Sequence, residues 1–128
     1  MSNSTVSLSP GEWQIMDRLW EKSPRTLMEL VRILAPDTGW SKSTIATMIT
    51  RLEAKGALTC AEGGRARLYS PAISRDQAAL QETESLLQRA YHGSVGMLVN
   101  ALAERESLTR KDIEELYAVL RKAEEEQS

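Results

Sequence analysis

The sequence predicts a mainly α-helical protein that carries one small β-hairpin. Three observations lead to this fold class. Apolar residues recur at helical spacing in three segments before residue 56. Two segments of strand length follow, joined by glycines, and from Ser74 onward the pattern is helical again.

The first predicted helix begins at a capping box. Ser9 can accept a hydrogen bond from the backbone N–H of Glu12, and the Glu12 carboxylate can reach back to the backbone N–H of Ser9. Pro10 suits the first helical position, and Ser23-Pro24 ends the helix. Its apolar face consists of Trp13, Ile15, Met16, Leu19 and Trp20.

Two further helices are joined by a predicted turn over residues 36–39. The second helix covers residues 26–35, and Pro36 is expected to end it. The third runs from Ser41 or Lys42 to Lys55, followed by Gly56 as a left-handed cap. Their apolar stripes are formed by Leu27, Leu30, Val31 and Leu34 in one helix and by Ile45, Met48, Ile49 and Leu52 in the other.

A hairpin is predicted after the third helix. Residues 57–61 and 65–70 form its strands, and Glu62-Gly63-Gly64 forms the turn. In an alternating strand Arg65 and Arg67 point to the same side. Three short helices followed by a hairpin is the element order of a winged helix-turn-helix, which we predict over residues 7–71.

The outer face of the third helix is small, polar and free of acidic residues, whereas a solvated helix face usually mixes both charges. Short side chains let a helix approach base edges in the major groove, and the methyl groups of Ala and Thr can pack on the thymine methyl. Lys42, Arg51 and Lys55 flank this face and can reach phosphates. We therefore predict that DNA is bound by Ser41, Lys42, Ser43, Thr44, Ala46, Thr47, Thr50, Arg51, Arg65 and Arg67.

Other interpretations of the same pattern remain open. Any surface helix has a polar outer face, and the two hairpin arginines could simply protect an exposed edge strand. The chain could then be a protein-interaction module that does not bind DNA, or an unrelated α+β domain.

Charge is distributed unevenly along the chain, whose net charge is −2. Residues 1–71 have nine Lys and Arg against seven Asp and Glu, and residues 72–128 have seven against eleven. Between residues 41 and 71 five basic residues face two acidic ones. Because fields act locally at contact distance, this segment is compatible with DNA binding despite the acidic whole.

Residues 74–122 are predicted to form three helices that make a dimer. A helical unit of this size struggles to bury a core alone, and a second copy would cover the rest. The alternative is that these helices fold back on residues 7–71 as one monomeric domain. The predicted dimer contacts are Leu80, Leu87, Tyr91, Leu98, Leu102, Leu116, Tyr117 and Leu120.

Composition argues against several classes of protein. One cysteine, Cys60, and one histidine, His92, cannot form an internal disulfide and are too few for an ordinary structural zinc site, and neither has a recognisable catalytic partner. We expect no metal, no cofactor and no enzymatic activity. Residues 1–8 lack the features of a signal peptide, and no apolar run approaches the roughly 20 residues that span a bilayer. A cytoplasmic protein without membrane insertion is expected.

Several motifs together resemble the penicillinase-repressor family, BlaI/MecI, to which the copper-responsive CopY repressors are related. They are Glu12-Trp13 with Met16 and Trp20, Trp40-Ser41 with Thr44-Ile45, Ile49-Thr50-Arg51-Leu52 before Lys55-Gly56, Tyr69-Ser70, and Asp112-Ile113-Glu114-Glu115-Leu116. The resemblance covers residues 7–120. It implies a homodimeric repressor that binds a palindromic operator of a β-lactam-resistance-type operon. The alternative within the same class of protein is a winged-helix repressor of an unrelated operon.

The resemblance also implies that repression ends by proteolysis, through a membrane-bound sensor metalloprotease that responds to β-lactam. The pair that matches the cleavage site of family members is Ala101-Leu102. Some members have Lys and Arg where this chain has Ser43 and Ala46, so the resemblance does not predict the sequence of the operator. The segment after Lys122 has no cysteine, which argues against metal sensing of the CopY type.

Overall fold

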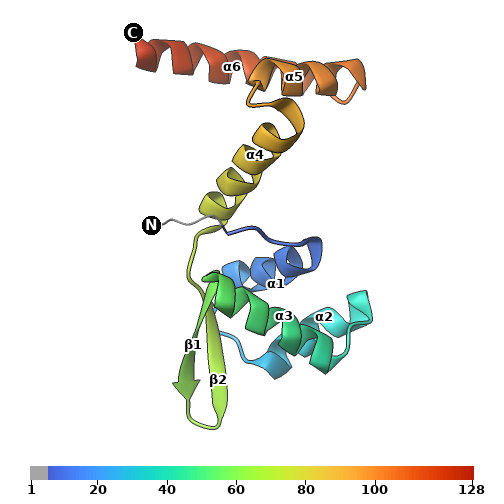
Figure 1. Ribbon diagram of the computed structural model, residues 1–128, viewed down its shortest axis with the longest axis vertical. Helices are drawn as coiled ribbons and strands as arrows, with labels where there is room; N and C mark the ends of the chain where they lie inside the picture. Colours follow the sequence, from blue (N-terminus) through green and yellow to red (C-terminus); the bar gives the residue numbers. More distant parts are fainter. Residues whose placement is uncertain (1–5) are drawn as a thin grey trace. The chain divides into compact units, whose positions relative to one another are not determined.

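The computed structural model describes residues 6–128; residues 1–5, which include most of the segment without signal-peptide features, lie outside the described part. Over the described residues the chain forms six helices and two strands (Figure 1). Their order is α1 (Pro10–Glu21), α2 (Leu27–Thr38), α3 (Lys42–Lys55), β1 (Leu58–Gly63), β2 (Ala66–Pro71), α4 (Arg75–Tyr91), α5 (Val95–Glu104) and α6 (Arg110–Gln127). The chain divides into two compact units, the first ending at Thr83 and the second beginning at Glu84.

Helix α1 begins at the predicted capping box. The Ser9 hydroxyl accepts from the backbone N–H of Glu12 at 3.2 Å, and the Glu12 carboxylate accepts from the backbone N–H of Ser9 at 2.8 Å. Both bonds satisfy N–H groups that have no partner within the helix. The helix ends at Lys22, directly before Ser23-Pro24, which confirms its predicted limits.

Helix α2 is longer than the sequence pattern indicated. A second capping box, Thr26 with Glu29, starts it, but the helix continues through Pro36 to Thr38, so the prediction that Pro36 ends it is wrong. The Thr38 hydroxyl donates to the Leu34 carbonyl at 2.8 Å, and the backbone N–H of Gly39 donates to the Ala35 carbonyl at 2.8 Å. These bonds close the last turn although a proline has no N–H to give.

Helix α3 has the predicted limits. Ser41 is its N-cap, and its hydroxyl accepts from the backbone N–H of Thr44 at 3.1 Å. Gly56 ends the helix with φ 83°, a left-handed conformation that glycine adopts without strain. Ile45, Ile49 and Leu52 are buried, and Met48 is partly buried beside them.

The hairpin turns one step later than predicted. Gly63 pairs with Ala66, so Gly64-Arg65 form a two-residue turn, and Arg65 lies in that turn instead of in β2. Gly64 has φ 79°, as the first central position of such a turn requires. Gly63 is the last residue of β1, and a glycine fits there because a Cβ would overlap the Leu68 side chain.

A short segment before α2 extends the two-stranded sheet. Arg25 and Tyr69 exchange backbone hydrogen bonds of 3.0 and 2.9 Å, which places the start of α2 against β2. The Arg25 side chain is 9% exposed, donates to the Arg18 carbonyl at 3.1 Å, and lies 3.4 Å from Glu21. The end of α1, the start of α2 and β2 are thereby held together.

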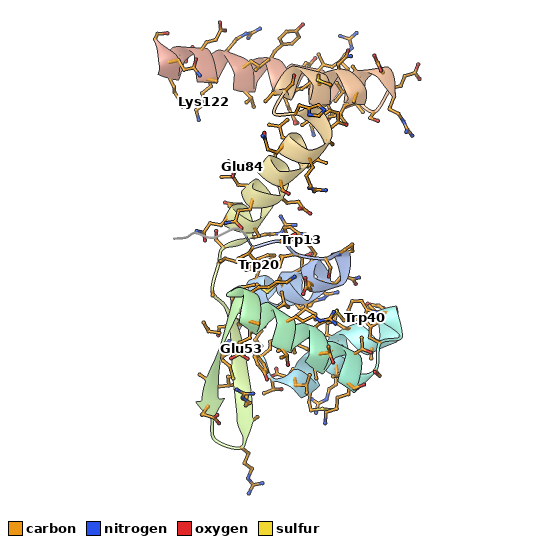
Figure 2. The ribbon with its side chains drawn as sticks, viewed as in Figure 1. Trp13, Trp20, Trp40, Glu53, Glu84 and Lys122 are labelled. Carbon is orange, nitrogen blue, oxygen red and sulfur yellow. The ribbon has the colours of Figure 1, made fainter. Side chains whose placement is uncertain are left out.

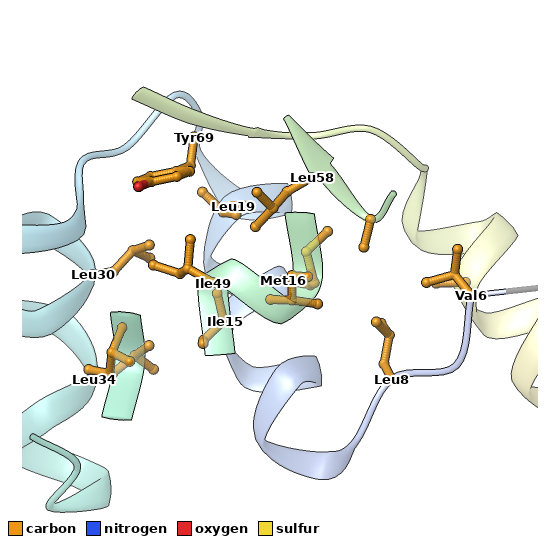
Figure 3. Close-up of a cluster of buried hydrophobic side chains, with 14 residues drawn as sticks. Val6, Leu8, Ile15, Met16, Leu19, Leu30, Leu34, Ile49, Leu58 and Tyr69 are labelled. Carbon is orange, nitrogen blue, oxygen red and sulfur yellow. The ribbon is translucent and has the colours of Figure 1, made fainter. Parts of the chain in front are cut away.

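The buried core belongs to the first unit (Figure 3). Helices α1, α2 and α3 contribute most of it, and the hairpin covers one side through Leu58 and Tyr69. Complete burial of a side chain such as Ile15 or Leu52 contributes about 1.5–3 kcal/mol. The buried apolar residues are Val6, Leu8, Ile15, Met16, Leu19, Leu30, Leu34, Ile45, Ile49, Leu52, Ala57, Leu58, Tyr69 and Ala78.

The beginning of α4 is bound to α1 within the first unit. The Trp20 indole N–H donates to the Ile73 carbonyl at 2.9 Å. Arg75 lies 3.2 Å from Asp17, and its guanidinium lies 5.9 Å from the centre of the Trp13 ring. The segment that follows the hairpin is therefore anchored on the outside of α1.

The second unit has no buried residue between Glu84 and Ser128. Its helices are nevertheless well capped: the Ser94 hydroxyl caps α5, and Thr109 with Asp112 forms a capping box at α6. Apolar grooves run along α6, lined by residues of α5, Leu108 and α6 itself. Its exposed large apolar side chains are Leu86, Val95, Met97, Leu102, Ile113, Tyr117, Val119 and Leu120.

Candidate nucleic-acid interface

The outer face of α3 is exposed and made of short side chains. Ser43, Thr47, Thr50 and Ala54 are exposed, and Ala46 at the edge of this face is half-buried. Thr44 and Arg51 on the opposite edge are exposed as well. The pattern arises because the apolar residues of α3 follow one stripe and leave the opposite side to small polar residues. The face has the size and shape to enter a groove closely.

The hydroxyl groups on this face bond mainly within the helix. Thr47 donates to the Ser43 carbonyl at 2.9 Å, and Thr50 donates to the Ala46 carbonyl at 3.0 Å. At the N-terminus the Ser41 hydroxyl donates to the Thr44 hydroxyl at 3.0 Å and lies 3.1 Å from the Ser43 hydroxyl. Such back-bonding is common for Ser and Thr inside helices.

Exposed cations lie on α3 and the hairpin. Lys42 and Arg51 on α3 are exposed, as are Arg65 in the hairpin turn and Arg67 in β2. In the register of the two strands Arg67 lies opposite Glu62. Because Arg65 lies in the turn, strand alternation does not place it on the same side as Arg67, contrary to the prediction.

The charge of Arg67 is permanent. Its pKa is raised above the ordinary value, first by the Cys60 side chain, then by Tyr69, and more weakly by Glu53 of α3, which Figure 2 labels. Glu53 is the one acidic residue of α3. Like any arginine, Arg67 stays charged at physiological pH, and it places a cation on β2 of the hairpin.

Lys55, which the sequence suggested could reach phosphates, is paired within the first unit. Its ammonium group lies 2.5 Å from the Glu12 carboxylate and donates to the Ser7 carbonyl at 2.8 Å. Burial alone raises the pKa of Glu12, but hydrogen bonds from Lys55 and the Ser9 backbone outweigh it, so the pKa lies below its ordinary value of 4.5. Lys55 thus binds the end of α3 to the start of α1.

Sequence reasoning did not find this pairing. Glu12 is 3% exposed, and the two residues are far apart in the chain. The available signal was the capping box, which identified Glu12 as a cap but gave no indication of a second partner.

The predicted DNA-binding residues all lie in the first unit. Eight are on α3 or its N-cap, and the two arginines are on the hairpin. Helix α3 packs against β1, since only Gly56 and Ala57 separate the two elements. The structure thus brings the helix and the wing together on one body.

The three tryptophans, Cys60 and His92 occupy structural positions. Trp13 and Trp20 form a tilted pair with ring centres 5.8 Å apart, and Trp40 packs near Gly11. Cys60 is half-buried opposite Tyr69. His92 has φ 51° in the turn after α4. Within residues 6–128 there is no cluster of three metal-ligating side chains and no helix both long and apolar enough to cross a membrane.

The predicted dimer contacts are spread over α4, α5 and α6. Leu80, Leu102, Tyr117 and Leu120 are exposed. Leu87, Tyr91, Leu98 and Leu116 are half-buried. The prediction omitted Val95, Met97, Ile113 and Val119, which are 42–63% exposed. Val95 and Ile113 lie on the apolar stripes that helical spacing defines in α5 and α6, whereas Met97 and Val119 lie off those stripes.

Comparison with known proteins identifies the family. The sequence model described as "Penicillinase repressor" matches residues 8–122. A penicillinase repressor of Bacillus licheniformis is 33% identical over 113 residues, which is 88% of this chain and 88% of that protein. The methicillin resistance regulatory protein MecI of Mammaliicoccus sciuri is 28% identical over 122 residues, or 95% of this chain and 99% of that protein.

Solved structures agree with this assignment. The solution structure of the DNA-binding domain of the repressor BlaI has a TM-score of 0.54 and 32% identity, and the match covers 59% of this chain and 93% of that one. The Bacillus licheniformis BlaI monomeric form in complex with the blaP half-operator has a TM-score of 0.52 and 32% identity, with 58% and 90% covered. The chain therefore has a winged-helix fold and belongs to the penicillinase repressor family, a family of repressors and not of enzymes.

Proposed function

We propose that the protein is a homodimeric transcriptional repressor that binds a palindromic operator. In this proposal α3 enters the major groove and the hairpin touches the phosphate backbone. One observation carries it: the first unit shares its fold and 32% of its sequence with a BlaI form whose structure was solved on a half-operator. The family's named members regulate penicillinase and methicillin resistance, so a β-lactam-resistance operon is the expected target.

The charges of the first unit support DNA as the ligand. Lys42, Arg51, Arg65 and Arg67 are exposed around an outer face that itself carries no acidic side chain. The remaining cation of α3, Lys55, is paired with Glu12 and holds the domain together. Four exposed cations per copy can each neutralise a phosphate, which supplies affinity without reading sequence.

Dimerisation is proposed from the second unit. A helix stabilises a fold by burying an apolar face, yet α5 and α6 bury none of their side chains. Tyr117 and Leu120 are 59% and 58% exposed, and both line a groove with Val99 and Leu116. A second copy of the same helices provides a matching apolar surface, which is how a twofold dimer forms.

Relief of repression by proteolysis is the remaining part of the proposal. The candidate bond joins Ala101 and Leu102 near the end of α5, where Ala101 is half-buried and Leu102 is 41% exposed. A cut there separates α6 from the rest of the chain and with it much of the proposed dimer surface. A membrane-bound sensor metalloprotease is the proposed partner for this step.

Selection from a random duplex pool tests the function. The full chain is expected to retain fragments that share a palindrome, because two copies present α3 to two half-sites. With up to eight phosphates neutralised per dimer, the logarithm of the binding constant falls by as much as about seven per tenfold rise in salt. Failure to retain any duplex at low salt would contradict the proposal and favour a protein-interaction module.

A further inference from the structure

The structure restricts how the outer face of α3 can read a base. Bidentate readout of guanine needs Arg or Lys, and bidentate readout of adenine needs Asn or Gln. Helix α3 contains no Asn or Gln, and its cations are Lys42 at the first residue, Arg51 at one edge, and Lys55, which is paired with Glu12. The centre of the face, at Ser43, Thr47 and Thr50, has no side chain that can make such a pair.

The hydroxyl hydrogens at this centre are already engaged. Thr47 and Thr50 donate to carbonyls of their own helix at 2.9 and 3.0 Å. The Ser41 hydroxyl donates to Thr44, so the hydrogen in the bond between Ser41 and Ser43 comes from Ser43. What Thr47 and Thr50 still offer to a base is a methyl group and the lone pairs of an oxygen.

We infer that the protein recognises its operator through thymine methyl groups that pack against the methyl groups of Thr47 and Thr50. The inference rests on the proposed function and adds the chemistry by which sequence is read. The thymine methyl is the apolar group that a base pair presents in the major groove, and it contacts small apolar side chains. Burial of one methyl group stabilises a complex by an amount that corresponds to about fourfold in affinity.

Deoxyuridine provides a direct test, because it lacks the methyl group and keeps every hydrogen-bonding atom of thymine. The full chain is first used to select its palindrome from a random pool, and each thymine of the half-site is then replaced in turn. At one or two positions the replacement in both half-sites should weaken binding about fifteenfold, as fourfold per half-site implies.

Two variants identify the protein side of the contact. Thr47→Ser removes the methyl group and keeps the hydroxyl, and should weaken binding to the thymine duplex but cause no further loss with the deoxyuridine duplex. Thr47→Val keeps a methyl group and removes the hydroxyl, and should stay within about twofold of the original chain. The same pair of changes at Thr50 should behave alike.

Thr83 gives a matched control. It donates to the Ala79 carbonyl at 2.9 Å in α4, in the same way as the two threonines of α3. Thr83→Ser should leave both duplexes bound as before.

The outcomes separate the inference from the function. If a palindrome is selected and bound but deoxyuridine at every position has no effect, the inference is wrong and the repressor function stands. If Thr47→Val weakens binding and Thr47→Ser does not, an oxygen contact reads the base and the inference is again wrong. If no palindrome is selected, the proposed function fails and the inference fails with it.

Discussion

Glu12 connects two parts of the first unit that are distant in sequence. Its carboxylate caps the start of α1 through the Ser9 backbone and also holds Lys55 at the end of α3. A carboxylate that is 3% exposed is stable only with such partners. The position of α3 relative to α1 thus depends partly on one side chain.

Replacing Glu12 by Gln is expected to destabilise the first unit by about 1–2 kcal/mol at neutral pH, because the charged hydrogen bond with Lys55 is lost. The pKa of Glu12 in the folded chain lies below 4.5. Its stabilisation is therefore complete above about pH 4.5 and declines as the pH falls through the folded-state pKa. Urea unfolding at pH 7 and near pH 3 should show the difference between the two chains shrinking in acid.

Glu29 serves as the control for this experiment. It caps α2 in the same way, through Thr26, but has no ion pair of this kind among the described residues. Glu29→Gln should lower the free energy of unfolding less than Glu12→Gln does at neutral pH. Equal losses would mean that capping, and not the pairing with Lys55, accounts for the effect.

At the scale of elements the wing has two arginines in different settings. Arg65 lies in the two-residue turn at the tip, whereas Arg67 lies in β2 opposite Glu62. A cation at the tip of a hairpin is free to meet the phosphate backbone. We therefore expect Arg65 to contribute to general DNA affinity and not to sequence choice.

Arg65→Ala should weaken binding to the selected palindrome and to a scrambled duplex by the same factor. The dependence of log K on log salt should flatten by about 0.9 for each half-site contact removed. Filter binding over a range of salt measures both quantities. Arg110→Ala, which removes an exposed cation from α6, is the control, and a loss confined to the palindrome would show that Arg65 contacts bases.

Elements were predictable from the sequence where the signal was local. The capping box of α1, the Ser41 cap and Gly56 of α3 each act within a few residues, and their helices have the predicted limits. The end of α2 was missed because Thr38 and Gly39 close the turn after Pro36. The predicted position of the hairpin turn was wrong because Gly63 is a strand residue that lies close to Leu68 and is not part of the turn.

The candidate site was predictable to the same extent. Which residues occupy the outer face of α3 follows from helical spacing alone. Two contacts did not follow from it, namely Lys55 with Glu12 and Arg25 with Tyr69, because each joins segments that only the tertiary fold brings together. A pattern that repeats every few residues contains no information on such pairs.

At the scale of the whole molecule the two units differ in how they are stabilised. The first has a buried core of its own, and the second has only half-buried and exposed residues between positions 84 and 128. The predicted ranges of 7–71 for DNA binding and 74–122 for dimerisation remain predictions, while the compact units divide within α4.

Leu120→Glu tests whether the second unit is completed by another copy. A charge on the apolar face of α6 should raise the dimer dissociation constant by at least about tenfold, because it would be buried without a partner. Sedimentation velocity should then show monomers at concentrations where the original chain is dimeric. Operator affinity should fall with it.

Lys122→Glu is the matched change. Lys122, labelled in Figure 2, lies about 200° around α6 from Leu120 and is exposed. This variant should remain dimeric. A chain that is monomeric without any substitution, or a Leu120→Glu variant as dimeric as Lys122→Glu, would contradict the proposed interface.

The three tryptophans all belong to the first unit. Trp13 and Trp20 form the pair on α1, and the Trp20 indole also binds the segment that leads into α4. Between Glu84 and Ser128 the aromatic residues are tyrosines, Tyr91 and Tyr117. Indole fluorescence therefore reports on one half of the chain alone and is blind to melting of the other. A spectroscopist can therefore follow the unfolding of the first unit by itself without adding a label.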